Sequence, residues 1–336
     1  MSDRSAIIVI GASAGGVEAI GRLVAALPRD FDAALFVVLH IGAHKSELPS
    51  LLNRWGTLRA SHPGNGEQIR RGHIYVAPPD HHMVLEEGVI RLTRGPRENW
   101  ARPAVDPLFR SAARAYGSDT IGVILTGGLN DGTAGLFEIK QRGGTTIVQD
   151  PDDAADPGMP RSALQHVAVD HCLPLGEIPP MLTTLVAGRR PGVAVAGTAF
   201  EVVKAGSEEM TADYTLNEPV AVTCPDCGGA LRRTELGTLI QFRCHIGHVY
   251  TAEVMVAAQF EAMEWALEAS MRALSERGEL CRQMADRSRE AEDAGSAAQW
   301  ASAMREAKER TGTLRQLLEK EWTHPAGIGS LVPSGG

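Results

Sequence analysis

The chain has 336 residues, of which 43% are hydrophobic, and its formal net charge is −8 at pH 7. This length accommodates one large domain and a small second one, and the acidic balance argues against nucleic acid as a partner. Because no apolar run is long enough to cross a bilayer and there is no room for a signal peptide, we expect a cytoplasmic protein without direct membrane insertion.

Up to about residue 186, short β-branched runs alternate with helical stretches. The predicted strands are Ala6–Ile10, Ala34–Leu39, His73–Val76, Met83–Leu85, Val89–Leu92, Ile121–Leu125 and Thr145–Val148. The predicted helices are Val17–Leu27, Pro107–Tyr116, Thr133–Gln141 and Pro160–His166. Continuous apolar strands separated by helices predict an α/β fold with a doubly wound, mostly parallel sheet, to which residues 73–93 add an antiparallel region.

A glycine-rich turn, Gly11–Gly16, follows the first predicted strand and places Ser13 between glycines. Strand, tight turn and helix form the setting that a G-x-S-x-G nucleophile turn requires. The helix N-terminus and the amide after Ser13 are suited to stabilise negative charge on a tetrahedral intermediate. Two other interpretations stay open, a turn without chemistry and a turn that binds a dinucleotide phosphate. The latter lacks both the G-x-G-x-x-G fingerprint and an acidic residue after the second strand.

A serine nucleophile needs a base and a third group that orients the base. His40 ends the second predicted strand, and Asp131 follows the strand Ile121–Leu125, so both are expected at the sheet edge that carries Ser13. A histidine at a strand end is often structural, and an aspartate before a helix is often only its cap. Together, however, three suitable residue types at three strand ends predict a triad of Ser13, His40 and Asp131.

Several segments also carry a family likeness. They are Gly11–Gly16, the strand ending in His40, Arg102–Asp106, Leu125–Gly132 and Gly158–Arg161. In this order, over roughly residues 6–187, they resemble the catalytic domain of CheB-type chemotaxis protein-glutamate methylesterases. The resemblance implies a Ser–His–Asp hydrolase that demethylates glutamate methyl esters on chemoreceptor helices, and often deamidates receptor glutamines, without a cofactor for catalysis. It puts the backbone of Ala14 and Gly128 near the oxyanion.

The chain also departs from the family pattern. Ala14 stands where family members usually have Thr, Gly128 where they usually have Met, and Leu39 where Gln is common. Since the resemblance starts at Ala6, we expect a standalone form without the usual regulatory receiver domain. The alternative functions are a catalytically weakened scaffold protein that binds partners and a nucleotide-binding α/β enzyme.

Three of the five cysteines lie close together in the second half of the chain. Cys224 and Cys227 form a C-x-x-C pair, and a predicted hairpin separates this pair from Cys244 and His248. The spacing predicts a zinc-ribbon-like segment with a four-ligand structural zinc, which leaves no open position for catalysis. His245 is the alternative fourth ligand, and a metal-free redox C-x-x-C is the alternative site.

After Thr251 the composition is rich in Ala, Glu, Arg and Met, and no proline occurs before Pro325. Two long helices with a break near residues 293–295 fit this stretch. The second helix has an apolar seam with steps of three and four, formed by Ala297, Trp300, Met304, Ala307, Thr311, Leu314 and Leu318. We predict an antiparallel hairpin that buries its own seam, with a surface for a helical partner as the alternative.

These patterns divide the chain into five parts. They are a methylesterase catalytic domain (1–187), a linker (188–220), a zinc-binding segment (221–250), a helical hairpin (251–322) and a disordered tail (323–336). Because the metal lies outside the catalytic domain, we expect hydrolysis of a small ester to survive zinc removal. The expected partner is a methylated, chemoreceptor-like helical protein.

Overall fold

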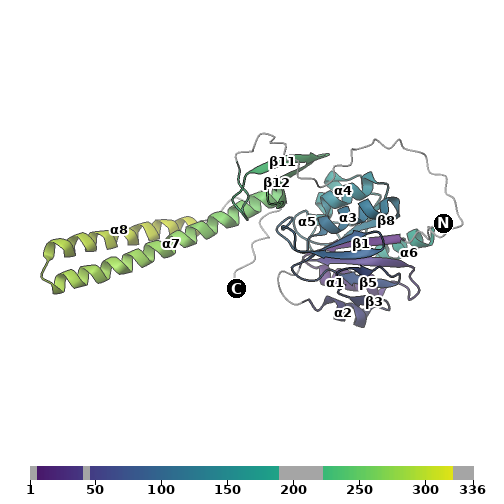
Figure 1. Ribbon diagram of the computed structural model, residues 1–336, viewed down its shortest axis with the longest axis horizontal. Coiled ribbons are helices and arrows are strands. Elements are labelled where there is room, and N and C mark those ends of the chain that lie inside the picture. Colours follow the sequence, from purple (N-terminus) through teal and green to yellow (C-terminus); the bar gives the residue numbers. More distant parts are fainter. Residues whose placement is uncertain (1–5, 41–45, 189–221, 321–336) are drawn as a thin grey trace. The chain divides into compact units, whose positions relative to one another are not determined.

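The computed structural model describes residues 6–40, 46–188 and 222–320 (Figure 1). The chain divides into two compact units, residues 1–255 and residues 256–336. The predicted linker from residue 189 onward and the predicted tail lie outside the described residues.

A seven-stranded sheet forms the centre of unit 1, in the order β10-β9-β8-β1-β2-β5-β3, and all its neighbouring strands pair in parallel. The strands are β1 (Ala6–Ala12), β2 (Ala33–Leu39), β3 (Arg59–Ser61), β5 (His73–Val76), β8 (Thr120–Ile124), β9 (Thr145–Gln149) and β10 (His171–Leu173). The accompanying helices are α1 (Gly16–Ala25), α2 (Leu48–Trp55), α3 (Val105–Tyr116), α4 (Thr133–Gln141), α5 (Gly158–His166) and α6 (Ile178–Gly188), with short 3-10 turns η1 (Gly117–Asp119) and η2 (Leu175–Glu177). This arrangement confirms the predicted α/β fold.

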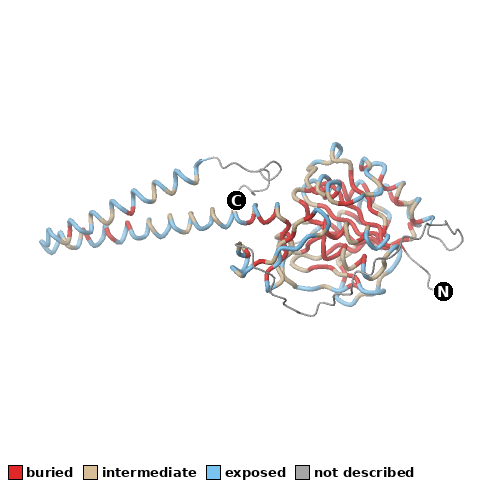
Figure 2. Tube along the Cα trace, turned by 90° about the horizontal axis from the view of Figure 1, so that it is seen from above, coloured by how far each residue is buried: buried red, intermediate tan, exposed pale blue. Residues whose placement is uncertain are grey.

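The sheet is buried on both faces, where the strands run through the interior (Figure 2). On β1, Ile8 joins the apolar cluster that contains Leu23 of α1, whereas Val9 joins the cluster that contains Phe109 of α3. All four side chains are fully buried. Because successive strand residues point to opposite faces, two apolar layers require strands that are apolar without interruption.

The strand order reverses beside β1. This strand pairs in parallel with β2 on one side and with β8 on the other. The loops after β1, β2 and β8 therefore meet at the carboxyl edge of the sheet, at a topological switch point where open α/β sheets bind ligands.

The sequence did not predict β3, β10, α2 or α6. The two strands have three residues each, and part of each strand is exposed, so neither has a continuous apolar run. The two helices carry prolines in their first turns, at Pro49 in α2 and at Pro179 and Pro180 in α6. Proline is tolerated in a first turn because the N–H that it lacks would have no helical partner there.

Two small antiparallel sheets complete unit 1. The first contains β4 (Glu67–Gln68), β6 (His82–Glu86) and β7 (Val89–Thr93), so residues 82–93 form the predicted antiparallel addition while β5 joins the main sheet. The second contains β11 (Leu231–Leu236), β12 (Leu239–Cys244) and β13 (Val249–Thr251). The predicted hairpin between the cysteine pairs is therefore extended by a third strand.

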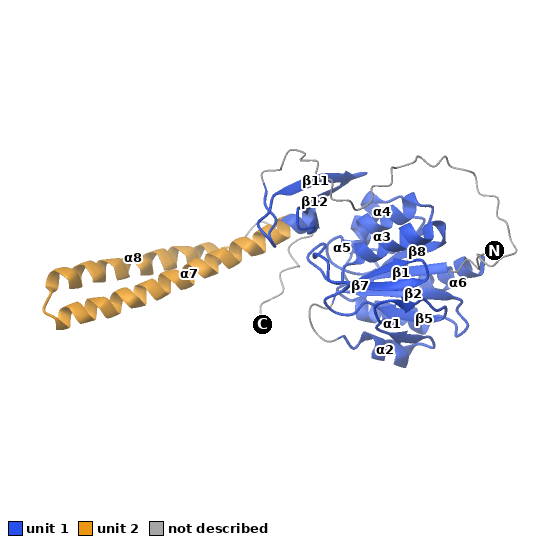
Figure 3. Cartoon of the chain, viewed as in Figure 1, with its two compact units in different colours: residues 1–255 blue, residues 256–336 orange. Residues whose placement is uncertain are grey.

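Unit 2 is a helical hairpin formed by α7 (Ala252–Glu290), which begins in unit 1, and α8 (Ala294–Leu318) (Figure 3). Small side chains permit close packing between the helices, since a Cβ built on Gly278 would lie 3.7 Å from the Ala307 Cβ. Trp300, predicted in the seam, is 37% exposed, and Trp265 of α7 is 69% exposed. Of the helices that the structure describes, none combines the length and apolar run needed to cross a membrane.

Candidate active site

Ser13 lies in the turn between β1 and α1, and it is half-buried. Its N–H donates to the carbonyl of Thr126, with an N···O distance of 3.0 Å, which ties the turn to the loop after β8. Gly15 has a φ of 73°, in the left-handed region that favours glycine. Gly127 lets the two loops approach, because a Cβ built there would lie 2.8 Å from the Ser13 Cβ. The glycines thus fix the serine at the carboxyl ends of two neighbouring strands.

His40 follows β2, whose last residue Leu39 lies opposite Ala12 at the end of β1. Ser13 and His40 are therefore the next residues along two adjacent strands. The His40 imidazole Nε2 lies 2.8 Å from Oδ2 of Asp131, which follows β8 on the other side of β1. The structure brings these three predicted residues to one edge of the sheet, from three different loops.

The Asp131 carboxylate is buried and accepts hydrogen bonds on both oxygens. The donors are His40 Nε2 and the Val105 N–H (2.6 Å) to Oδ2, and Asn99 Nδ2 (3.0 Å), the Gly132 N–H (3.0 Å) and the Asp106 N–H (3.3 Å) to Oδ1. Burial raises the pKa of Asp131, but the hydrogen bond and charge of His40, together with the donors Val105 and Asn99, lower it below its ordinary value. Val105 starts α3, so a helix N-terminus also favours the ionised form.

A second carboxyl group, Asp106, is fully buried beside the first. Its Oδ1 accepts the Gly135 N–H at 2.7 Å, and its Oδ2 accepts Asn99 Nδ2 at 2.9 Å. Burial and the charge of Asp131 raise the pKa of Asp106 well above its ordinary value. The pKa values of the two neighbouring carboxyl groups are thus shifted in opposite directions, which favours the anion of Asp131 and the protonated acid of Asp106.

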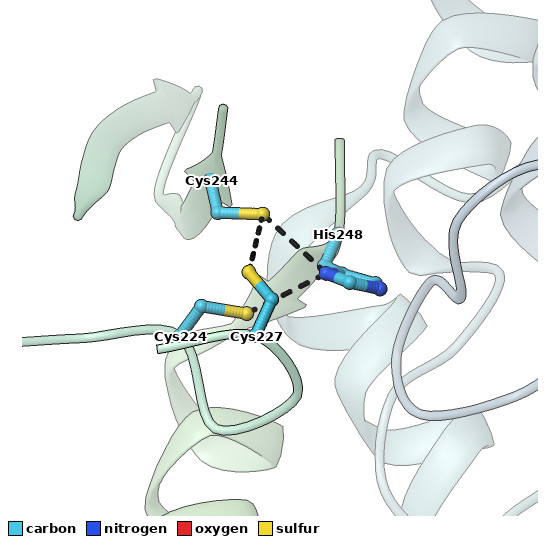
Figure 4. Close-up of side chains that lie close together, drawn as sticks. All are labelled: Cys224, Cys227, Cys244 and His248. Carbon is cyan, nitrogen blue, oxygen red and sulfur yellow. Dashed lines mark hydrogen bonds between the residues drawn. The ribbon is translucent and has the colours of Figure 1, made fainter. Parts of the chain in front are cut away.

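Cys224, Cys227, Cys244 and His248 point toward one another (Figure 4), and their candidate ligand atoms all lie within 4.8 Å of one another. The distances are 3.7 Å between Cys227 Sγ and Cys244 Sγ, and 3.4 Å between Cys244 Sγ and His248 Nδ1. A tetrahedron with Zn–S bonds of about 2.3 Å has edges of roughly 3.7 Å, so the spacing suits zinc. The alternative ligand His245 is not in this group. We call residues 222–255, which hold this group within unit 1, the cysteine segment.

The cysteine segment contacts the loop before α3 and the loop after β8. The Asn99 N–H donates to the Val249 carbonyl at 2.8 Å, and the Thr251 N–H donates to Asn99 Oδ1 at 3.1 Å. The Thr251 hydroxyl donates to Asn130 Oδ1 at 2.6 Å, and Asn130 Nδ2 donates to Glu253 Oε2 at 2.7 Å. Although Asn130 lies in a segment that carries the family likeness, the sequence did not predict these contacts, because nothing in a single sequence links Asn99 to a position 152 residues later.

Ala14 and Gly128 lie on the two loops that meet at Ser13. The Ala14 carbonyl accepts the Thr126 hydroxyl at 2.9 Å, while both Gly127 backbone groups are paired, with the Asp156 carbonyl and the Met159 N–H. In the part of the chain that the structure describes, no hydrogen bond is formed by the N–H of Ala14 or of Gly128. Both groups are thus available as donors to a bound ligand.

Comparison with known proteins bears on this arrangement. The model of the CheB methylesterase family matches residues 8–182, more than half of the chain. The chain belongs to the CheB methylesterase family. The CheB methylesterase catalytic domain of Thermotoga maritima matches with a TM-score of 0.52 and 36% sequence identity, over 54% of this chain and 99% of that one.

Two relatives show how far the likeness extends. The "Protein-glutamate methylesterase/protein-glutamine glutaminase 2" of Anaeromyxobacter dehalogenans is 43% identical over 183 residues, 54% of this chain and 54% of that protein. A "Putative protein-glutamate methylesterase/protein-glutamine glutaminase" of Leptospira interrogans is 40% identical over 173 residues, 51% of this chain and 90% of that protein. The chain therefore spans about half of the first relative and most of the second. The cysteine segment lies outside the residues that match the CheB methylesterase family.

Proposed function

We propose that this chain is a serine hydrolase that demethylates protein glutamate methyl esters. The observation that carries the proposal is the 2.8 Å contact between His40 and Asp131, at the end of the strand beside Ser13. A base oriented by an ionised carboxylate, next to a serine in a strand–turn–helix setting, is the arrangement that activates a hydroxyl nucleophile. Membership of the CheB methylesterase family supports the ester as the substrate class.

The geometry supports a two-step acyl transfer. Because His40 Nε2 donates to the Asp131 anion, Nδ1 is the ring nitrogen left to accept the Ser13 proton. Ser13 Oγ attacks the ester carbonyl carbon, and the methoxy group leaves as methanol with the proton from His40. Water, deprotonated by the same histidine, then hydrolyses the glutamyl ester of Ser13 and releases the glutamate carboxylate and the free serine.

The oxyanion of each tetrahedral intermediate needs donors that are already in place. We assign this role to the N–H groups of Ala14 and Gly128, which flank Ser13 on its two supporting loops. These donors belong to the backbone and not to the side chains. They are therefore present although Ala14 replaces the usual Thr and Gly128 replaces the usual Met. This argues against the weakened-scaffold alternative.

The proposed substrate is a methylated, chemoreceptor-like helical protein in the cytoplasm. Both relatives are named for glutaminase as well as methylesterase activity. Since an amide and an ester form the same acyl-enzyme, we propose deamidation of glutamine as a second reaction of the same triad. The standalone form expected from the sequence stays a prediction.

We also propose that the cysteine segment holds a structural zinc ion through Cys224, Cys227, Cys244 and His248. Three thiolates and one imidazole at tetrahedral spacing are the donors that zinc prefers, and four protein ligands leave no catalytic position. Metal analysis of protein purified without chelators should find about one zinc ion per chain. Protein free of zinc would refute the site.

The exposed face of the hairpin is the proposed contact to a helical partner. Trp265 and Leu280 of α7 are 69% and 62% exposed, although large apolar side chains favour burial. A methylated receptor helix is the occupant that accords with the proposed substrate.

The function is tested by the methanol released from a methylated receptor, comparing the native chain with Ser13→Ala. Loss of the nucleophile should reduce the rate by roughly 10³-fold or more. Ser118, an exposed serine just before the amino end of β8 and so at the opposite end of that strand from the triad, offers the matched control, and Ser118→Ala should retain the native rate. Near-native release from a folded Ser13→Ala protein would refute the triad.

A further inference from the structure

We propose that the cysteine segment is needed for catalysis because Asn99 and Thr251 act as positioning residues for Asp131. The inference rests on the proposed triad and extends it beyond the residues that match the CheB methylesterase family. Three links lead from Asp131 outward to the cysteine cluster.

The first link is the Asn99 side chain, whose Nδ2 donates to Asp131 at 3.0 Å and to Asp106 at 2.9 Å. The amide orientation is determined by its partners, since the reversed amide would direct its oxygen at the Asp131 carboxylate and its NH₂ at the Thr251 N–H. Asn99 is 5% exposed, and its φ of 47° lies in the left-handed region that asparagine tolerates. The Thr251 N–H therefore helps to fix the amide that orients the Asp131 carboxylate.

The second link is the Thr251 side chain. Its hydroxyl donates to Oδ1 of Asn130, the residue directly before Asp131, at 2.6 Å. The Thr251 residue is fully buried and Asn130 is 2% exposed, so water has little access to replace the bond. Thr251 is thus linked to Asp131 in two ways. Its hydroxyl binds Asn130, the residue that precedes Asp131 in the same loop, and its N–H binds the Asn99 amide.

The third link joins Thr251 to the metal ligands. Thr251 ends the three-residue strand β13, which begins at Val249, directly after His248. The Val249 carbonyl accepts the Asn99 N–H at 2.8 Å, and β13 pairs with β12, whose last residue is Cys244. Because structural zinc supplies much of the folding free energy of such small units, metal loss should release β13 and with it the support of Asp131. This reverses the expectation that small-ester hydrolysis survives zinc removal.

The test uses the full chain and compares Thr251→Val with Thr251→Ser. Valine keeps the shape of threonine and removes the donor to Asn130, whereas serine retains the hydroxyl. With a small soluble ester, Thr251→Val should lower kcat by about tenfold or more at a KM within about twofold, because misplacing a triad member costs turnover rather than binding. Thr251→Ser should restore most of the native kcat.

A second readout does not depend on turnover. The N–H shared by His40 and Asp131 should give a low-field proton resonance, assigned by its loss in His40→Ala. Thr251→Val should shift or broaden this resonance, and Thr251→Ser should not. If Thr251→Val does not fold, Asn99→Gly tests the same link, because glycine accepts the left-handed backbone and removes the amide.

A folded Thr251→Val protein with native kcat and an unchanged resonance would overturn the positioning role. If the native chain hydrolyses no ester, the proposed function fails, while the resonance in the same variants still decides whether the cysteine segment orients Asp131.

Discussion

The cysteine segment and the helical hairpin follow each other along the chain, yet their contacts differ in kind. The cysteine segment reaches the active-site loops through buried polar groups such as Thr251 and Asn130. Unit 2 buries small residues such as Ala297 and Ala307, and it carries exposed ion pairs such as Arg282 with Glu279. Exposed ion pairs contribute little to the free energy of folding, whereas a buried polar network fixes the positions of the side chains that form it. Both parts lie beyond the family match, and within unit 1 the described residues of the cysteine segment have contacts suited to control the chemistry.

The largest expected effect is at Asp131, the residue that the cysteine segment supports. Asp131→Asn should reduce small-ester kcat by about 10⁴-fold, because an amide cannot stabilise the imidazolium and favours the wrong histidine tautomer. Steady-state kinetics measure the loss, and the circular dichroism spectrum should stay native because the side-chain shape is retained. Unchanged turnover would leave Asp131 with a structural role alone, as the acceptor of the N–H groups at the start of α3.

Next in size is the loss of the metal. Cys244→Ser should release zinc and lower small-ester hydrolysis by about tenfold to a hundredfold through movement of β13. Hydrogen exchange should rise in residues 222–251 and in the loop around Asn99. Cys172, an exposed thiol outside the cluster, provides the matched control, and Cys172→Ser should retain both zinc and activity. Full activity in zinc-free protein would show that the cysteine segment has no influence on catalysis.

A substitution on the exposed face of the hairpin, unlike loss of the metal, should leave small-ester hydrolysis unchanged and slow only the demethylation of intact receptor. Trp265→Ala removes a side chain that is 69% exposed, so small-ester hydrolysis should stay within about twofold of native. Demethylation of intact receptor should fall by about fivefold if this face binds a helical partner. Ala266, the exposed neighbour of Trp265, offers a control, since Ala266→Ser should alter neither rate. Equal rates on receptor for Trp265→Ala and native protein would leave the hairpin without a docking role.

The smallest effect concerns His82, which supports the loop that the cysteine segment contacts. Its Nε2 lies 2.9 Å from the Pro96 carbonyl, and its Nδ1 accepts the Ala104 N–H at 3.2 Å. Burial lowers the pKa of His82 in the folded chain, so the unfolded chain binds this proton first as the pH falls. The free energy of unfolding should therefore decline as the pH drops below about 6.5, and the Tm with it. His82→Gln should show a shallower decline, and an equal slope would exclude this histidine as the cause.

The sequence predicted the parts of the active site that follow strand ends. Apolar runs such as Ile121–Leu125 are visible in one sequence, and the residues after them share one sheet edge by the rules of parallel sheets. Asn99 could not be found in this way, because its left-handed backbone and its bond to Thr251 depend on tertiary packing. Trp300 was placed in the hairpin seam by its spacing alone, and it is 37% exposed, whereas the seam positions Ala297 and Ala307 are buried.

Active-site labelling tests most directly whether Ser13 is the nucleophile of a triad. A serine-reactive phosphonate, followed by mass spectrometry of the intact chain and of its peptides, should show one label per chain on the peptide that contains Ser13. The label should be absent from Ser13→Ala and should form much more slowly in Asp131→Asn. Labelling of Ser13→Ala at the native rate, or a label on another serine, would contradict the account.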